Sequence, residues 1–202
     1  MTAPKYKRLP PGDRAAELVE AGLRVLAKGG LTAFTIDNIC KASGASRGLV
    51  GHHFGGKDGL LAACYAAAYA PLLQVLSPDN PPDLDWLVAE LLSDRQFRRE
   101  GLNIWLALWG EIAVNPALRA EHLRQYDRYH RAIAGAMARE GVAEADRLAS
   151  GLIALLDGLW VEMCIAPDRM GLETARQVVG DYLGPHLVVG VAAPRSGRDE
   201  TA

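Results

Sequence analysis

Apolar residues recur at intervals of three and four along almost the whole chain, and no segment keeps the strict alternation of a half-buried strand for long. The clearest loop lies at residues 77–85, where Pro78, Pro81 and Pro82 interrupt any regular element. The helices that the spacing predicts span residues 13–28, 36–42, 47–54, 57 to about 71 or slightly past it, 84–93, 96–114, 116–139, 143–165 and 172–187. The pattern therefore predicts an all-α fold.

The second and third predicted helices are short and sharply bounded. Thr35 and Ser46 stand where N-caps are expected, and Gly44 and Gly55 stand where helices end. Residues 43–45 leave only a tight turn between the two helices. This arrangement predicts a helix-turn-helix motif.

The distribution of charge separates the N-terminal part of the chain from the rest. Residues 1–57 hold nine Lys or Arg and four Asp or Glu, a net charge of +5, whereas the whole chain has a net charge of −2. A basic head on an acidic body is expected when a module that binds a polyanion is joined to a different domain, although chance asymmetry is the alternative. We therefore predict a DNA-binding domain over residues 1–57, a second helical domain over 58–190 and a mobile tail over 191–202.

The third helix has residues that suit the major groove of DNA. Arg47 in its first turn can present its guanidinium fork to guanine, while Gly48 and Gly51 lack side chains that would hold the backbone away from the bases. Free N–H groups at helix N-termini and nearby hydroxyls or cations can hold phosphates. The expected DNA-binding residues are Thr35, Ser46, His52 and Lys57 as phosphate contacts, and Arg47, Gly48 and Leu49 as base contacts, with Gly51 allowing close approach.

Four short motifs follow one another through the head: Thr35-Ile36, Gly44-Ala45-Ser46-Arg47-Gly48, His52-His53-Phe54 and Lys57-Asp58-Gly59-Leu60-Leu61. Over residues 13–61 their order and spacing resemble the DNA-binding head of the TetR family of bacterial transcriptional regulators. The resemblance implies an all-helical homodimer with a divergent ligand-binding body, and most members are repressors that a small molecule releases from DNA. Many members have a phosphate-contacting tyrosine where this chain has Gly51, so His52 and Lys57 are expected to carry more of that contact.

Two further segments resemble one branch of the family. Residues 50–61 and Asp157-Gly158-Leu159-Trp160 are similar to the BetI-like regulators, which control the synthesis of betaine from choline. The resemblance implies choline or a related quaternary ammonium compound as the effector.

Aromatic and acidic residues in the body are candidates for an effector pocket. Trp105 and Trp109 lie one turn apart on one helical face, an arrangement that simple core packing also explains. Aromatic rings with a carboxylate would suit a quaternary ammonium ion. The candidate pocket residues are Trp105, Trp109, Glu111, Tyr126, Asp157 and Trp160, with Tyr129 and Glu162 as further candidates. Asp157 and Glu162 interrupt an apolar helix, which a polar contact in a dimer interface would equally explain.

Two other classes of protein compete with a regulator. Residues 51–58 nearly match a phosphate-binding P-loop, G-x-x-x-x-G-K-[ST], which would indicate a nucleotide hydrolase. The motif requires a preceding strand and a final hydroxyl, whereas residues 41–50 are predicted as a turn and a helix and Asp58 is a carboxylate. The third class is a helical interaction protein without DNA binding.

The sequence gives no positive sign of catalysis, a metal or a cofactor. Cys40, Cys64 and Cys164 are far apart and fit no zinc-binding spacing, and we expect a reduced, cytoplasmic protein. The five histidines include three in the body that we expect on solvated helix surfaces: His122, His130 and His186. The first fifteen residues are too charged for a signal peptide, and the uncharged stretch 59–76 is interpreted as a buried or interfacial helix rather than a membrane span.

These expectations combine into one mechanism. The resemblance to the family implies that two apolar helices, over residues 143–165 and 172–187, pair with their symmetry mates, and the two heads would then occupy successive turns of a pseudo-palindromic operator. Lys5, Lys7 and Arg8 would form a flexible cationic arm. A ligand in the body would then shift the helix that begins near Lys57 and separate the heads.

Overall fold

The computed structural model describes residues 11–75, 83–96 and 98–187, and the regular structure in these ranges is entirely helical. In chain order the elements are α1 (Pro11–Ala33), α2 (Ile36–Ser43), α3 (Arg47–Phe54), α4 (Lys57–Val75), α5 (Leu84–Leu91), α6 (Arg99–Ile112), α7 (Pro116–Arg139), α8 (Ala145–Ile165), α9 (Leu172–Leu183) and the 3₁₀ helix η1 (Gly184–His186). The predicted all-α fold is confirmed. The cationic arm with Lys5, Lys7 and Arg8, most of the predicted loop at 77–85 and the tail at 191–202 lie outside the described residues.

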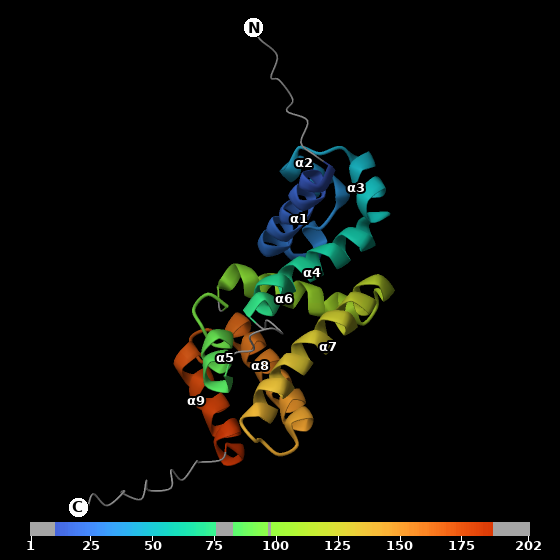
Figure 1. Cartoon of the computed structure of the whole chain (residues 1–202). Coiled ribbons are helices and arrows are strands. Elements are labelled where there is room, and N and C mark those ends of the chain that lie inside the picture. Colours follow the sequence, from blue (N-terminus) through green and yellow to red (C-terminus); the bar gives the residue numbers. More distant parts are fainter. Residues whose placement is uncertain (1–10, 76–82, 97, 188–202) are drawn as a thin grey trace, which may run out of the picture.

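The first three helices form a small bundle at one end of the molecule (Figure 1). Leu18, Phe34, Ile39 and Val50 are fully buried in it and bring α1, α2 and α3 onto one core. Gly44 takes a left-handed conformation, with φ of 69°, and turns the chain from α2 towards α3. The two short helices predicted from the caps are therefore present and joined as a helix-turn-helix.

Helix α4 connects this head to the body. It packs against α1 and α3 on one side and along α7 on the other, and α1 also packs on α6 (Figure 1). Leu60, Leu61, Cys64 and Tyr65 are almost completely buried along α4. Any movement of α4 relative to the body therefore moves the head with it.

Two predicted helix ends are close to those of the structure, and a third differs. Gly30 has a non-helical backbone, with φ of 59° and ψ of −159°, two residues after the predicted end at residue 28, and a short helical stretch to Ala33 follows it within α1. Helix α4 continues four residues past Pro71 to Val75, in line with a predicted end at or slightly past that proline. At the other end of the chain α9 ends at Leu183, because Pro185 follows in a separate 3₁₀ turn.

Two helices begin later than predicted, because turns occupy residues that were predicted to be helical. Ser93 to Gln96 form a turn, in which the Gln96 amide donates to the Ser93 carbonyl at 3.0 Å, so α6 begins at Arg99 rather than at residue 96. Helix α8 begins at Ala145 rather than 143, after Glu144 with a positive φ of 55°.

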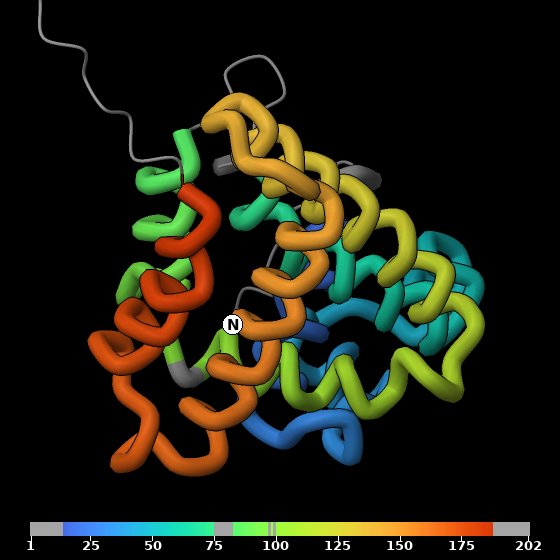
Figure 2. Tube along the Cα trace, turned by 90° about the horizontal axis from the view of Figure 1, so that it is seen from below, coloured from blue at the N-terminus to red at the C-terminus, as the bar shows by residue number. Residues whose placement is uncertain are grey.

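Helix α8 lies at the centre of the body, between α7 and α9, and also packs on α6 (Figure 2). Helix α5 stands beside α9, where the Arg176 guanidinium donates to the Leu92 carbonyl at 3.0 Å. Among the described helices, α8 is the one that is long and apolar enough to cross a membrane by length and composition. The uncharged stretch at 59–76, which the sequence analysis interpreted as a buried or interfacial helix, lies largely in α4 instead. Helix α8 packs on three helices and 39% of its apolar window is buried, so part of this apolar length builds the core of the body.

Candidate nucleic-acid interface and ligand pocket

The predicted DNA contacts gather on the outer side of the helix-turn-helix. Arg47 and Gly48 at the start of α3 are exposed, as are Gly51 and His52 further along it and Lys57 at the start of α4. Leu49 is only partly exposed and packs against the core of the head. This surface therefore lacks side chains at two glycines and carries basic side chains at both ends of α3.

The two caps at this surface are not equivalent. The Thr35 hydroxyl accepts from the Asn38 amide at 3.2 Å and so caps α2. Ser46 has the extended backbone of an N-cap, but its hydroxyl makes no capping hydrogen bond to α3. The Ser46 hydroxyl is consequently available to an outside acceptor such as a phosphate.

Arg47 has a partner within the head. Its guanidinium forms an ion pair with Asp37, in the first turn of α2, and both side chains are largely exposed. An exposed pair of this kind contributes little to stability, so the guanidinium can exchange this carboxylate for another acceptor. The pair also directs the Arg47 side chain towards the first turn of α2.

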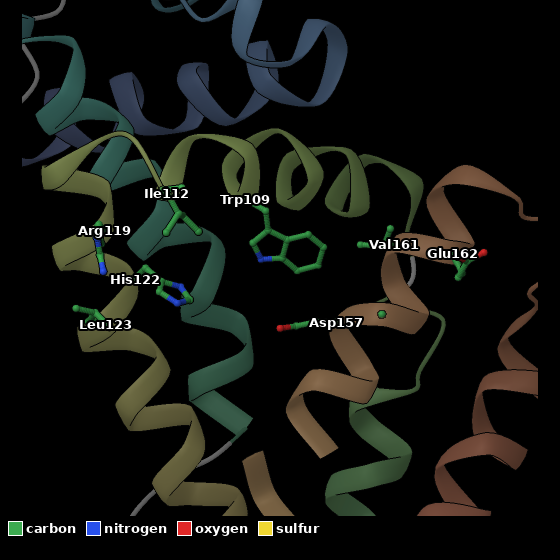
Figure 3. Close-up of a pocket in the computed structure, with 10 residues that line it drawn as sticks. Trp109, Ile112, Arg119, His122, Leu123, Asp157, Val161 and Glu162 are labelled. Carbon is green, nitrogen blue, oxygen red and sulfur yellow. The ribbon is translucent and has the colours of Figure 1, made fainter. Parts of the chain in front are cut away.

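A second site lies in the body, where α6, α7 and α8 line a cavity of about 780 Å³ that is open to solvent. Trp109 projects from α6 towards Asp157 of α8, and His122 enters from α7 (Figure 3). The other lining residues are Ile112, Ala113, Arg119, Leu123, Gly158, Val161 and Glu162. The volume is in the range of sites for small organic ligands, and the walls combine apolar surface with a few charged groups.

Asp157 is the chemically distinctive group of this cavity. Burial raises the pKa of its carboxyl from 3.8 to about 7, because the ionised form loses hydration. A cation brought into the cavity would favour the ionised form and bind to it. Glu162, one turn further along α8, is exposed at the rim.

His122 departs from the expectation of a solvated surface. It is half-buried on the cavity wall, its Nδ1 lies 2.7 Å from the Tyr65 hydroxyl of α4, and burial lowers its pKa. His130 is also engaged, with Nε2 at 2.9 Å from the Ser150 hydroxyl of α8. His186 is exposed, as expected, with its ring 6.2 Å from that of Tyr182.

An aromatic cluster lies behind the cavity. The Trp105 ring packs edge-on against Tyr65 and Tyr69 of α4, with centroids 5.6 and 4.8 Å away, and Trp109 lies 6.3 Å further on. Tyr129 is buried 6.3 Å from Tyr69. The cavity wall at Trp109 is therefore continuous with the packing of α4.

The structure separates the predicted pocket residues into two groups. Trp109 and Asp157 line the cavity, together with Glu162. Trp105 lies behind Trp109, and the Tyr126 ring is 5.6 Å from that of His122. Glu111 and Trp160 are not among the lining residues, and Trp160 is buried instead.

Sequence reasoning missed the α7 residues that line the cavity, Arg119, His122 and Leu123, and some neighbours of Trp109 and Asp157. Helical spacing alone marks Ile112 and Ala113, which follow Trp109 at intervals of three and four, and Val161, which follows Asp157 at four. His122 had no such signal, because its importance depends on Tyr65, 57 positions away in the sequence.

The rival P-loop interpretation conflicts with the structure. Residues 36–43 and 47–54 are helices, so Gly51 lies inside a helix and no strand precedes it as the phosphate-binding motif requires. In the described ranges no group of three His, Cys, Asp or Glu side chains is placed to hold a metal ion, and none of the three cysteines forms a disulfide.

A helix-turn-helix head on a helical body with a ligand-sized cavity defines a class of transcriptional regulators. Residues 18–64 match the family described as bacterial regulatory proteins, tetR family, and residues 83–188 match the BetI-type transcriptional repressor, C-terminal. The HTH-type transcriptional regulator BetI of Burkholderia mallei (strain NCTC 10229) is 31% identical over 178 residues, covering 84% of this chain and 91% of that protein. The BetI regulator of Burkholderia thailandensis is 32% identical over the same shares.

Solved structures agree with these relatives. A transcriptional regulator from Pseudomonas aeruginosa PAO1 superposes with a TM-score of 0.76 and 30% identity, over 88% of this chain and 92% of that one. A regulator from Saccharomonospora viridis, solved in complex with choline, shares the fold with a TM-score of 0.71 and 23% identity, over 87% and 98%. The chain belongs to the TetR family and carries a BetI-type C-terminal region. It is a DNA-binding transcriptional regulator, in a family of regulators rather than enzymes.

Proposed function

We propose that the protein is a homodimeric repressor that leaves its operator when a quaternary ammonium compound of the choline type occupies the cavity between α6, α7 and α8. The observation that carries this proposal is the placement of Trp109 opposite Asp157 in that cavity. An indole face and a carboxylate together attract an organic cation. Such a cation is larger and less polar than a metal ion, and it suits a cavity with apolar walls.

The head supplies the DNA-binding part of the proposal. Thr35, Ser46, His52 and Lys57 would hold phosphates, while Arg47, Gly48 and Leu49 would contact bases and Gly51 would let the backbone approach. The exposed edge of α3 fits a major groove, and its basic residues fit the negative phosphates on either side. DNA binding would place the protein in the cytoplasm.

The second copy would pack on α8 and α9. Ile165 at the end of α8 is 68% exposed, an unusual position for a large apolar side chain at the end of a core helix. A two-fold axis along these helices would pair four helices and set two heads on one face of a duplex. The proposed domains are those predicted from sequence, residues 1–57 for DNA and 58–190 for the ligand and the partner.

Arg47→Ala is expected to weaken binding to a promoter fragment from immediately upstream of the coding sequence by about 1 to 3 kcal/mol and to relax sequence preference. The reason is the loss of a guanidinium fork at the first turn of α3. Fluorescence anisotropy at two salt concentrations measures the effect, with Arg131→Ala in the body as a charge-matched control. An equal loss on a random duplex would refute base reading, and no binding by the unaltered protein would favour a helical interaction protein.

Choline chloride is expected to stabilise the folded protein. A ligand that binds only the folded state at 100 times its Kd raises the free energy of unfolding by about 2.7 kcal/mol. A thermal-shift titration measures this, with sodium chloride at equal ionic strength and Trp109→Ala as controls. If choline and betaine aldehyde both fail while an unrelated metabolite shifts the transition, the proposed ligand class is wrong.

A further inference from the structure

Two polar contacts join α4 to the start of α7. The Asn115 amide donates from Nδ2 to Asp58 Oδ1 at 3.1 Å, and the Tyr65 hydroxyl lies 2.7 Å from His122 Nδ1. Asp58 and Tyr65 are seven residues apart, and so are Asn115 and His122, so each pair is separated by the same 57 positions. The helices therefore run in the same direction, and both contacts depend on one register between them.

On the α7 side, one of the two contacts lies in the wall of the cavity, because His122 lines it directly. Asn115 is not a lining residue, but it lies in the α6–α7 turn, between the lining residues Ala113 and Arg119 in the sequence. A ligand that displaces this part of the wall would act on His122 directly and on Asn115 through the turn.

On the α4 side, the same contacts reach the DNA-binding head. Asp58 is in the first turn of α4, next to Lys57, which we propose as a phosphate contact. Tyr65 is completely buried two turns further on, packed against Trp105. The contacts thus connect the cavity wall to the helix that begins where the head ends.

The asparagine side chain at position 115 both caps α7 and contacts α4. Its Oδ1 accepts from the Leu118 amide at 3.0 Å and caps α7, while its Nδ2 reaches Asp58. Asp, Ser or Thr would cap the helix as well, but the amide of Asn adds the donor that a carboxylate requires. The Asn115 residue is 7% exposed, so its own polar atoms have little access to water, whereas Asp58 is exposed and its carboxylate also meets solvent.

We propose that these two contacts, Asn115–Asp58 and His122–Tyr65, form a clasp that fixes α4 against α7 and transmits occupancy of the cavity to the head. Asn115 and Tyr65 are positioning residues in this device. The proposal rests on the proposed function, and it adds the residues through which the ligand controls DNA binding. Because both contacts share one register, sliding α4 along α7 breaks them together, which gives the switch two discrete states.

Asn115→Asp tests the inner contact without removing the cap. Aspartate still caps α7, but it sets a second carboxylate against Asp58. We expect N115D to weaken binding to the promoter fragment at least tenfold without ligand, and D58N/N115D, which restores the hydrogen bond with donor and acceptor exchanged, to return within threefold of the unaltered protein. Unchanged affinity in N115D, or failure of the double variant to recover, would overturn the proposal.

Tyr65→Phe tests the outer contact, because it removes the hydroxyl and keeps the ring packing. We expect Y65F to reduce at least fivefold the ratio of DNA affinities measured without and with choline chloride. Tyr129→Phe is the matched control, since its buried hydroxyl makes no hydrogen bond in the described structure, and it should leave the ratio unchanged. Equal effects of the two variants would contradict the clasp.

Hydrogen exchange separates failure of the clasp from failure of the proposed function. Measured without DNA or ligand, amides of residues 57–65 and 115–122 should exchange faster in N115D and regain protection in D58N/N115D. If the unaltered protein neither binds the promoter fragment nor responds to choline, the proposed function fails while this exchange pattern still supports the clasp. Equal exchange in all three proteins overturns the clasp whatever the DNA result.

Discussion

Gly59→Ala is expected to destabilise the protein by about 3 kcal/mol and to abolish DNA binding. A Cβ atom at this position would lie 1.9 Å from the carbonyl oxygen of Phe54 and 3.0 Å from its carbonyl carbon. Both are backbone atoms, so no side-chain rotation relieves the overlap. The start of α4 would have to move away from the end of α3, and the head would lose its packing against the body.

Gly110→Ala is the matched control for this prediction. Gly110 is exposed in the last turn of α6, and nothing lies within 4 Å of its added Cβ. Alanine has the higher helix propensity, so this variant should match the unaltered protein or exceed it by up to about 1 kcal/mol. Urea denaturation measures the stability of both variants, and fluorescence anisotropy measures their binding to the promoter fragment. An unfolding midpoint for Gly59→Ala equal to that of the control would show that the turn between α3 and α4 is not tight.

Asp157→Asn is expected to make the protein more stable than the unaltered chain at pH 8, by about 3 kcal/mol, and equally stable near pH 4. Burial raises the pKa of Asp157 to about 7 in the folded state, well above its ordinary 3.8. Between these pH values the folded protein holds a proton that the unfolded chain releases. Stability is therefore lost as the pH rises from about 4 to 7, and an amide at this position removes the loss.

Denaturation of both proteins at a series of pH values measures this difference. Asp168→Asn, in the exposed turn that follows α8, is a suitable control because its side chain is outside the cavity. A stability difference that does not change with pH would mean that Asp157 is ionised in the folded protein throughout. On the proposed function, choline should also bind more tightly as the pH rises through 7, and Asp157→Asn should remove that dependence.

The head was predictable because its signals are local. The cap at Thr35 and the left-handed glycines at 44 and 55 act within one turn of their own positions, and the structure has α2 and α3 where these residues place them. The break near the end of α1 was predictable for the same reason, since Gly30 takes a non-helical conformation, but the short helical stretch from there to Ala33 had no local signal.

The cavity was predictable only in part. Trp109 and Asp157 were recognisable as an aromatic and an acid within apolar helices. Glu111 was a weaker candidate on geometry, because two residues along a helix correspond to about 200° of rotation, which turns it away from Trp109. His122 and Asn115 depend on Tyr65 and Asp58, and no local pattern reveals a pairing across 57 positions.

The two glycines of α3 have a consequence for how this regulator could acquire a new target. Gly48 and Gly51 lower the intrinsic helicity of an eight-residue helix, so α3 keeps its shape through Val50 and its neighbours in the core rather than through its own composition. No atom lies within 4 Å of a Cβ added at Gly51, and the nearest at Gly48 is 3.9 Å away. Side chains introduced there would meet no steric barrier and would favour the helix, which makes this surface a ready position for retargeting the protein to a different operator.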